Sequence, residues 1–415
     1  MPRSMGLDRP LLVVVVLLAI MGVVILYSAG QTDVPNYAAT GAWKRQIVWI
    51  GAGIVMAALA FRISPRMLEW LALPLYVLAL LLLGLTLVIG AGAGTAASSK
   101  SWIYIGGHAL GQPAEFAKLA VVLMLARHLS SRREAPDSLW ELVPACLIAG
   151  IPALLVLLQP DLGSALVFAG ILFAAIFWAG TAPSHLILLA SPAVSLLLAF
   201  NLWTWVAWMV LLAFLLAIWR PYLLEGILVA AANSVMGFIA LPIWRSLARY
   251  QQNRLLTFLN PEVDPQKAGY HAIQSKVAIG SGGWFGNGYL DGPQKRLAFL
   301  PEQHTDFIFA VVGEELGFVG VVVALAVFLA LFLVMMRIAR RATDSFSSVM
   351  VFGLLGLLFT HVFENIGMTV NVMPITGIPL PFFSYGGSFL LACSIAIGLT
   401  LRVAWDARRA GYIDI

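Results

Sequence analysis

Long apolar runs, separated by short polar or proline-containing breaks, fill most of the sequence. A helix needs about 20 mostly apolar residues to cross a bilayer, because lipid offers no partner for backbone N–H and C=O groups. On this pattern we expect crossings near residues 10–28, 46–61, 69–91, 113–127, 139–158, 162–180, 185–200, 204–219, 223–243, 307–336, 347–370 and 386–404. The pattern therefore predicts an all-α polytopic integral membrane protein with about 12 transmembrane helices.

The composition agrees with lipid as the main solvent of this chain. Hydrophobic residues make up 61% of it and charged residues 11%, whereas soluble domains are roughly a quarter charged. The first apolar run has no small-residue cleavage site before a soluble domain, so we expect it to be a retained span. Cys146 and Cys393 both fall in apolar runs, which argues against a disulfide framework or a cysteine metal site.

The basic residues predict the orientation in the membrane. The net charge is +5, but Lys and Arg near span ends usually report topology, so we expect membrane lipids and no nucleic acid as partners. With the N-terminus in the cytoplasm, the inner ends of the spans hold Arg3, Arg9, Arg62, Arg66, Arg127, Arg132, Arg133, Arg220, Arg337, Arg340, Arg341, Arg402, Arg408 and Arg409. The short outer loops hold only Lys44, Arg45 and Lys100. An even number of spans returns the C-terminus to the cytoplasm.

The longest polar element is then an extracytoplasmic segment at residues 244–306. A loop of this length is usually either functional or disordered. Its aromatic residues and an apolar stretch at 273–279 argue against disorder and favour packing on, or into, the membrane surface. No domain boundary is evident, so residues 1–415 are expected to form a single membrane domain.

Three ionisable residues, Glu302, His304 and Asp306, end this outer segment immediately before an apolar span. Asp306 stands where a helix is about to begin, so it is either an N-cap or a carboxylate at the lipid–water boundary, where partial desolvation raises basicity. Glu314 and Glu315 add acids inside the span, where charge is costly and usually functional.

A second group lies in and after the outer loop before the 113–127 span. Glu115 and Lys118 are three residues apart and share one helix face, so they either form an ion pair or contribute to a site. In the second case Lys118, or Lys100 from the loop, would meet a phosphate. Trp102 would stack on a sugar or belong to the aromatic belt at the membrane interface.

Two further stretches lie at outer boundaries. In Gln159-Pro-Asp-Leu-Gly163, Asp161 is expected to cap the next helix. The Pro- and Gly-rich stretch at 374–388 is tolerated at membrane depth only where it lines a cavity or is covered by protein. Just before it, His361, Glu364 and Asn365 share a helix face, for which interhelical hydrogen bonding is the simplest explanation. The absence of Walker, HExxH and GxSxG motifs disfavours ATPase, metalloprotease and serine-hydrolase functions.

Taken together, these blocks resemble the SEDS (shape, elongation, division and sporulation) family, which includes RodA and FtsW. The motifs that carry the resemblance are Gly111-Gln-Pro-Ala-Glu-Phe-Ala-Lys118, Gln159-Pro-Asp-Leu-Gly163, Asn260-Pro with Gly269-Tyr270, Gln274-Ser-Lys276 and Leu300-Pro-Glu-Gln-His-Thr-Asp306, and Gly377-Ile-Pro-Leu-Pro with Ser384-Tyr-Gly-Gly387. Residues 250–261 are more similar to RodA than to FtsW.

The resemblance implies a glycosyltransferase of the bacterial cytoplasmic membrane that polymerises lipid II onto a nascent glycan strand during elongation. It maps an essential aspartate onto Asp306, as general base or as ligand of a divalent cation, Mg²⁺ or Mn²⁺. It also implies a class B penicillin-binding protein as partner. The residues that it implies as substrate-binding are Lys118, Glu115, Lys100, Trp102, Glu302, His304, Lys276, Ser384 and Tyr385.

The chain departs from the family at one place, because the family has about ten spans. The additional apolar segments form an expected extra hairpin near residues 185–219. Two extra crossings preserve parity and keep Asp306 outside, whereas two interfacial segments would return the count to about ten. A lipid II flippase is the alternative function and a scaffold the third, although a transporter usually has repeated halves, which we do not find.

Overall fold

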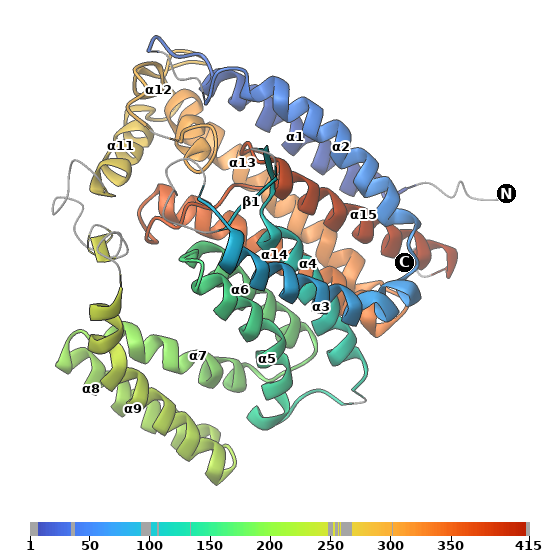
Figure 1. Cartoon of the computed structure of the whole chain (residues 1–415), viewed down its shortest axis with the longest axis vertical. Coiled ribbons are helices and arrows are strands. Elements are labelled where there is room, and N and C mark those ends of the chain that lie inside the picture. Colours follow the sequence, from blue (N-terminus) through green and yellow to red (C-terminus); the bar gives the residue numbers. More distant parts are fainter. Residues whose placement is uncertain are drawn as a thin grey trace.

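The computed structural model describes residues 7–411 except 35–37, 93–100, 106–107, 133, 248–251, 254–255, 257, 259–267 and 301. It is a bundle of long helices (Figure 1). Every predicted crossing forms a helix, and these are α1 (Arg9–Ala29), α2 (Ala42–Arg62), α3 (Pro65–Ile89), α4 (Pro113–Ser130), α5 (Leu139–Leu157), α6 (Leu162–Trp178), α7 (Pro183–Leu198), α8 (Leu202–Trp219), α9 (Leu223–Ser246), α13 (Ile308–Arg340), α14 (Ser345–Thr369) and α15 (Gly387–Arg409).

By length and composition, nine of the described helices are able to cross a membrane. Two more, α6 and α7, are apolar but shorter. The predicted all-α polytopic fold is therefore confirmed.

Short polar side chains fix where several of these helices begin. Asp8 accepts a hydrogen bond from the backbone N–H of Leu11 at 3.1 Å and so caps α1. Asp161 does the same for Ser164 at 3.0 Å, which confirms its predicted role as the cap of α6. Each cap satisfies a backbone donor that would otherwise lack a partner at the helix N-terminus.

The centre of the bundle is built from α4, α14 and α15, with α14 and α15 the most buried of the candidate spans. Small residues let these helices approach closely. A Cβ placed on Gly398 of α15 would lie 2.3 Å from the carbonyl oxygen of Ala57 in α2, and one on Gly53 would meet the Ser394 hydroxyl at 2.4 Å. Close backbone approach of this kind replaces the hydrophobic driving force that lipid does not supply.

Helices α7, α8 and α9 form a separate group at one edge of the bundle, at the lower left of Figure 1. They share a small core of Leu188, Leu212 and Val229. Glu225, in the first turn of α9, ties this group to the bundle by accepting the backbone N–H of Leu139 in α5 at 2.9 Å. The hairpin predicted near residues 185–219 is thus α7 and α8, at the bundle periphery.

The outer segment carries α11 (Ala268–Ser281) and α12 (Pro293–Arg296), and it packs onto a break in α13. At Gly317 the backbone φ is positive (+63°), and this conformation interrupts the helical hydrogen bonds of α13. The N–H of Phe318 donates instead to the carbonyl of Gly283 at 2.9 Å, and the carbonyl of Glu314 accepts from Asn287 at 3.0 Å. Irregular backbone is tolerated here because another part of the protein satisfies it.

The two acids of α13 belong to this same junction. Glu314 accepts the backbone N–H groups of Gln294 and Lys295 at 2.6 and 3.2 Å and so holds the N-terminus of α12. Glu315 pairs with the Lys295 ammonium at 2.6 Å and accepts the Ser28 hydroxyl of α1 at 2.5 Å. These acids therefore hold α12 against α13 and α1.

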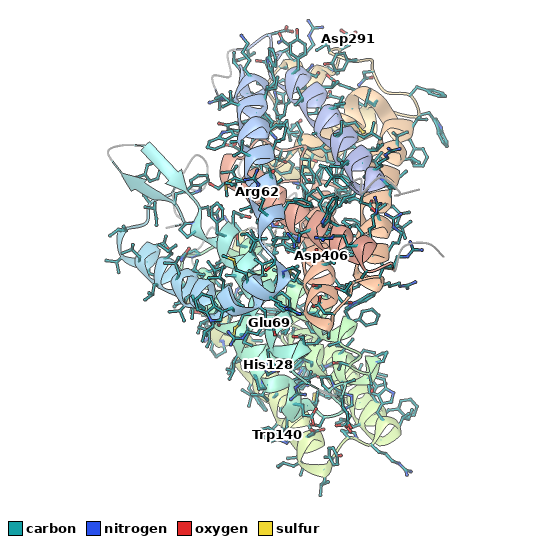
Figure 2. The ribbon with its side chains drawn as sticks, turned by 90° about the vertical axis from the view of Figure 1, so that its right-hand side faces the viewer. Arg62, Glu69, His128, Trp140, Asp291 and Asp406 are labelled. Atoms are coloured by element: carbon teal, nitrogen blue, oxygen red, sulfur yellow. The ribbon has the colours of Figure 1, made fainter. Side chains whose placement is uncertain are left out.

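A small hairpin that the hydropathy pattern did not predict precedes α4. Its antiparallel strands are β1 (Ile103–Ile105) and β2 (His108–Gly111). Figure 2 shows Asp291 of the outer segment at the top of the molecule, apart from Arg62, Asp406, Glu69 and His128, which lie lower on this side.

Candidate active site

Asp306 lies in the turn that leads into α13, and its side chain is partly buried. The helix begins at Ile308 with Phe307 in the N-cap position, so the N-cap interpretation of Asp306 is wrong by one residue. The amide of Asn365 in α14 donates to the carbonyl of Asp306 at 2.8 Å and to the carbonyl of Ile378 at 2.7 Å. Asn365 thus holds Asp306 beside the Pro- and Gly-rich loop at 374–386.

That loop approaches the Asp306 carboxylate at Gly377. A Cβ built on Gly377 would lie 3.2 Å from Asp306 Oδ2, and the φ of Gly377 is +75°. Few residues other than glycine adopt this backbone conformation without strain. The glycine therefore lets the loop come close to the carboxylate.

Ser384 and Tyr385 fasten the far end of the loop to the same turn. The Ser384 hydroxyl donates to the carbonyl of Thr305, and the N–H of Tyr385 donates to the carbonyl of His304 at 2.9 Å. The side chain of Gln46 in α2 donates to the carbonyl of Ser384 at 3.1 Å. Two segments that are far apart in the sequence are thereby fixed together.

His304 is buried in this junction, with its ring stacked on Tyr385 at 6.2 Å between centroids. The Arg45 guanidinium lies 4.8 Å from the centroid of the Tyr385 ring, a cation–π distance. Burial lowers the pKa of His304; the Glu302 carboxylate opposes this shift and Arg45 reinforces it. A lowered pKa keeps the imidazole neutral at pH 7, as either a donor or an acceptor.

The predicted ion pair of α4 is present and fully buried. The Lys118 ammonium lies 2.8 Å from Glu115 Oε1 and 3.0 Å from His361 Nε2. The other ring nitrogen of His361 lies 3.3 Å from the carbonyl of Pro379, in the loop that approaches Asp306. The two polar groups predicted on separate spans thus belong to one connected network.

Glu364, one turn beyond His361 in α14, is 1% exposed. Neither of its carboxylate oxygens has a hydrogen-bond partner within 3.5 Å among the described residues, although the Thr376 hydroxyl lies close by and donates instead to the sulfur of Met368. Lys118 and Asp161 are close enough to act on it electrostatically. Interhelical hydrogen bonding therefore explains His361 alone, because Asn365 bonds to a turn and a loop and Glu364 has no such bond. A buried polar group without a partner is rare and points to a ligand or water.

The second outer turn packs against the same loop. A Cβ on Gly163 would meet the Ile378 side chain at 2.5 Å and that of Thr376 at 3.0 Å. Asp161, besides capping α6, accepts the amide of Gln112 at 2.9 Å. Described residues of all four motifs therefore converge at one end of α4, α6, α13 and α14.

The remaining predicted residues lie elsewhere or cannot be placed. Trp102 is half-buried and pairs with Ala91 through backbone hydrogen bonds of 2.9 and 3.1 Å. Lys276 is exposed on α11, while its neighbour Ser275 is buried and donates to the carbonyl of Thr369 at 2.7 Å. Lys100 lies outside the described residues.

Sequence reasoning missed several residues of this network. Gln46 and Arg45 were read only as span boundary and topology signals, although Gln46 is fully buried. A lone amide at the start of an apolar span was a usable signal, because such a group needs a partner in lipid. Gln112 belongs to one of the motifs, but its contact with Asp161 joins two different spans. Residue spacing along the sequence cannot predict a contact of this kind.

Comparison with known proteins then identifies the family. The model of the FtsW/RodA/SpoVE family of cell cycle proteins matches residues 8–207 and 190–409. The chain belongs to this family. The two matches overlap at 190–207, within α7 and α8, where the extra hairpin was expected.

Members of the FtsW/RodA/SpoVE family resemble the chain along nearly its whole length. The peptidoglycan glycosyltransferase MrdB of Escherichia coli K12 is 35% identical over 397 residues, 96% of this chain and 93% of the relative. The peptidoglycan glycosyltransferase RodA of Treponema pallidum is 35% identical, with 95% and 97% covered. The probable peptidoglycan glycosyltransferase FtsW of Geobacter metallireducens is 34% identical, with 96% and 94% covered.

Solved structures agree. A chain from a peptidoglycan synthase complex that coordinates polymerisation and crosslinking matches with a TM-score of 0.70 and 30% identity, covering 97% of this chain and 98% of the other. The rod shape determining protein RodA of Thermus thermophilus matches with a TM-score of 0.62 and 29% identity, covering 98% and 99%.

Proposed function

We propose that the protein is a peptidoglycan glycosyltransferase that polymerises lipid II into glycan strands during cell elongation. The observation that carries the proposal is the convergence of Asp306 with the buried Lys118, His361 and Glu364 at one end of the bundle. Relatives that cover almost the whole chain bear the name of this activity, which supports the assignment.

The reaction needs one base and a stabilised leaving group. The 4-hydroxyl of the incoming disaccharide attacks the anomeric carbon of the lipid-linked strand, and the bond from that carbon to undecaprenyl pyrophosphate breaks with inversion. Asp306 takes the hydroxyl proton as the new glycosidic bond forms. Pyrophosphate leaves readily once its charge is neutralised, so no second, acidic carboxyl of the glycosidase type is required.

Lys118 is the protein's own cation for that charge. Its ammonium lies between Glu115 and His361 with no exposed surface, so a buried network holds it in place. Charge-assisted contacts are stronger in such surroundings than in water. In this role Lys118 supports the departing pyrophosphate while Asp306 acts on the attacking sugar.

A divalent cation, Mg²⁺ or Mn²⁺, would fit between the Asp306 carboxylate and the pyrophosphate of the substrate. Among the described residues no group of three His, Cys, Asp or Glu side chains forms a complete metal cage. Mg²⁺ is commonly held by one or two carboxylates together with substrate phosphates. As the alternative to the general-base role, Asp306 would be the protein ligand of this ion, which would supply further neutralisation of the pyrophosphate charge.

The sugar has two further groups to meet. Glu364 offers buried oxygens without a partner, which would accept a sugar hydroxyl or an amide N–H of the substrate. Tyr385, backed by His304 and Arg45, offers an aromatic face beside the turn that carries Asp306.

The proposed setting is the bacterial cytoplasmic membrane, with both termini in the cytoplasm and Asp306 on the outer side, as the distribution of arginines indicates. A class B penicillin-binding protein is the proposed partner, because the structural relative comes from a complex that couples polymerisation to crosslinking. In that complex the partner would crosslink the strands made here.

The decisive experiment compares Asp306→Asn with the native chain, each purified with its partner and given fluorescent lipid II and Mg²⁺. We expect glycan ladders from the native chain and a loss of about 10²-fold or more in the variant, the usual contribution of a general base. Asp291→Asn, at an exposed position of the same outer segment, is the matched control and should polymerise normally.

Unchanged melting temperatures would show that Asp306→Asn folds. Full polymerisation by Asp306→Asn would refute the assignment. Head-group translocation in liposomes without ladders from either protein would instead establish the lipid II flippase.

A further inference from the structure

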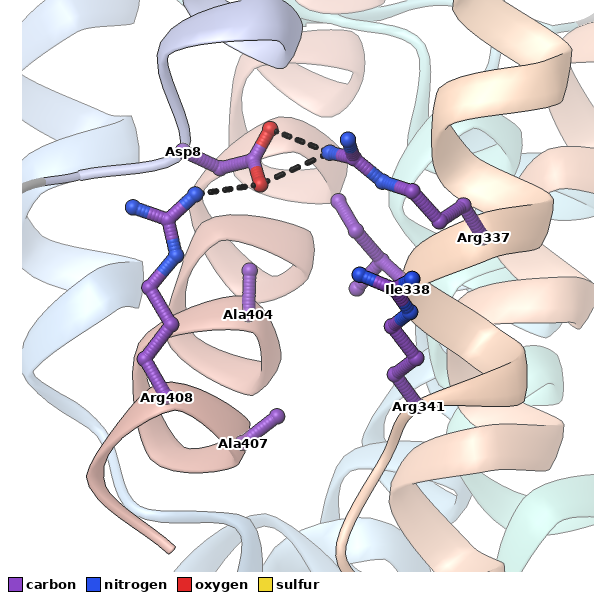
Figure 3. Close-up of a pocket in the computed structure, with 7 residues that line it drawn as sticks. All are labelled: Asp8, Arg337, Ile338, Arg341, Ala404, Ala407 and Arg408. Carbon is purple, nitrogen blue, oxygen red and sulfur yellow. Dashed lines mark hydrogen bonds and ion pairs between the residues drawn. The ribbon is translucent and has the colours of Figure 1, made fainter. Parts of the chain in front are cut away.

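Two adjoining hollows lie at the end of α13 that is opposite Asp306. The first is lined by Asp8, Arg337, Ile338, Arg341, Ala404, Ala407 and Arg408, from the start of α1 and the last turns of α13 and α15 (Figure 3). The second, about 290 Å³ in volume, shares Arg337 and Arg341 and adds Leu333, Met336 and Arg340. We call the two together the arginine pocket.

A single buried carboxylate holds two of these arginines in place. Arg337 Nη2 donates to both Asp8 oxygens at 2.8 Å, and Arg408 Nη2 donates to Asp8 Oδ2 at 2.8 Å. Asp8 is itself fixed by capping α1 at Leu11. Figure 3 shows Asp8 between the two guanidinium groups, with Arg341 below Arg337 on the α13 side of the pocket, across from Arg408. The arginines are therefore preorganised before any ligand arrives.

The charge of the pocket is strongly positive. Four arginines line it, and Asp8 is the only acid among the lining residues. Arginine forms paired hydrogen bonds to phosphate oxygens and is weakly hydrated. A cluster of arginines therefore favours a phosphate over a neutral ligand. Asp8 offsets one of the four charges, and the C-termini of α13 and α15 reduce the potential further but do not cancel the remaining three.

The pocket also has an apolar side that faces lipid. Leu333 is 54% exposed on α13, one to two turns before the arginines, and Met336 is partly exposed beside it. The part of α13 after the break at Gly317, residues 318–340, spans about 35 Å at 1.5 Å per residue, enough to cross the hydrocarbon core and reach a headgroup layer. The arginines therefore lie at headgroup level with apolar side chains directly below them.

We propose that the arginine pocket binds the phosphate of an anionic phospholipid, with an acyl chain lying along Leu333 and Met336. A soluble phosphate would satisfy the arginines, but it would leave the adjoining apolar surface unused. Basic pockets between helices at a membrane surface are known to take such headgroups. The site is separate from the polymerisation network, so it does not depend on the proposed function.

Native mass spectrometry of the full chain in detergent tests this directly. The protein is titrated with phosphatidylglycerol and, separately, with phosphatidylcholine. The pocket variant is Arg340→Gln with Arg341→Gln, which leaves the Asp8 pairs intact. The matched control is Arg62→Gln with Arg66→Gln, which removes two exposed charges from the α2–α3 turn.

We expect the native chain to retain phosphatidylglycerol over phosphatidylcholine, and the pocket variant to bind it roughly 25-fold more weakly, at about fivefold per arginine. The control should bind like the native chain. Melting temperatures without added lipid check that both variants fold.

Three results would overturn the proposal. Normal phosphatidylglycerol binding by the pocket variant would show that Arg340 and Arg341 do not bind the lipid. Equal weakening in both variants would reduce the effect to general surface charge. A third result concerns inorganic phosphate alone. If it raised the melting temperature of the native chain as much as phosphatidylglycerol does, the pocket would be assigned to a soluble anion.

Discussion

The Lys118 ammonium has no exposed surface, and it contacts the Glu115 carboxylate at 2.8 Å and the His361 ring at 3.0 Å. Removing one member of a buried ion pair is costly, because the other charge stays buried without compensation. Replacing both members by apolar residues is often neutral or stabilising. Stability and catalysis can therefore be separated at this pair.

We predict that Lys118→Met lowers the free energy of unfolding by about 3–5 kcal/mol. The double variant Lys118→Met with Glu115→Leu should recover most of that loss. Neither should polymerise lipid II, because the pyrophosphate would lose its protein cation. Thermal unfolding in detergent gives the stabilities, and glycan ladders give the activities.

A double variant that regains both stability and polymerisation would limit the pair to a structural role. Glu115→Leu alone completes the cycle, since it leaves Lys118 buried and unpaired and should also destabilise.

At this scale, spacing predicted which residues share a helix face but not what faces them. The three-residue separation of Glu115 and Lys118 placed them on one helix face and offered an ion pair as one of two alternatives, and the pair is present. His361, Glu364 and Asn365 were equally well placed on one face, yet only two of them found protein partners. The exception could not be predicted, because spacing within α14 does not show how the loop that follows it and the distant turn at Asp306 fold over this helix face.

The break in α13 is the clearest feature at the scale of an element. At Gly317 the φ is +63°, and a Cβ there would lie 2.3 Å from the backbone nitrogen of Gly286. The break lets the 282–288 loop pair with the α13 backbone, as the hydrogen bond from Phe318 to Gly283 illustrates. Any side chain at Gly317 must displace that loop or straighten the helix.

We predict that Gly317→Ala lowers the free energy of unfolding by about 1–3 kcal/mol, the usual cost of holding a residue in a disfavoured conformation, with the backbone clash in addition. Gly84→Ala is the control, because Gly84 lies in α3 with nothing within 4 Å of an added Cβ. It should be neutral or stabilise by up to about 1 kcal/mol. Thermal unfolding in detergent compares the two.

An unaffected Gly317→Ala would mean that the loop yields without cost and that the break does not fix the outer segment.

Hydropathy located every long helix but did not reveal this break. Residues 307–336 form one apolar run, and a glycine within such a run is common in membrane helices. The break requires a loop to satisfy its backbone groups, and that loop is recognisable only after folding. The β1–β2 hairpin was missed for a similar reason, since its strands are short and pair only with each other.

At the scale of the whole molecule, the bundle has two chemically different ends. One carries Asp306, the Pro- and Gly-rich loop and α11–α12, and the other carries Asp8 and the arginine pocket. Lys and Arg placement predicted this asymmetry from the sequence, because the positive-inside rule depends on loop composition and not on packing. The position of α7–α9 at the periphery was not predictable in detail, since their apolar faces suit lipid and protein equally well.

The proposed chemistry requires that the Asp306 end face outward, and cysteine accessibility tests this. Cys146→Ala with Cys393→Ala provides the background, to which Asp291→Cys or Thr343→Cys is added; both positions are exposed, one in the outer segment and one in the turn between α13 and α14. In spheroplasts, a membrane-impermeant maleimide should label the Asp291→Cys variant fully and the Thr343→Cys variant only after lysis. Lipid-linked disaccharides are polymerised outside the cell membrane, so the reverse pattern would place Asp306 away from its substrate. Equal labelling of both positions only after lysis would likewise contradict the odd number of crossings, nine, that we predict between the N-terminus and the outer segment.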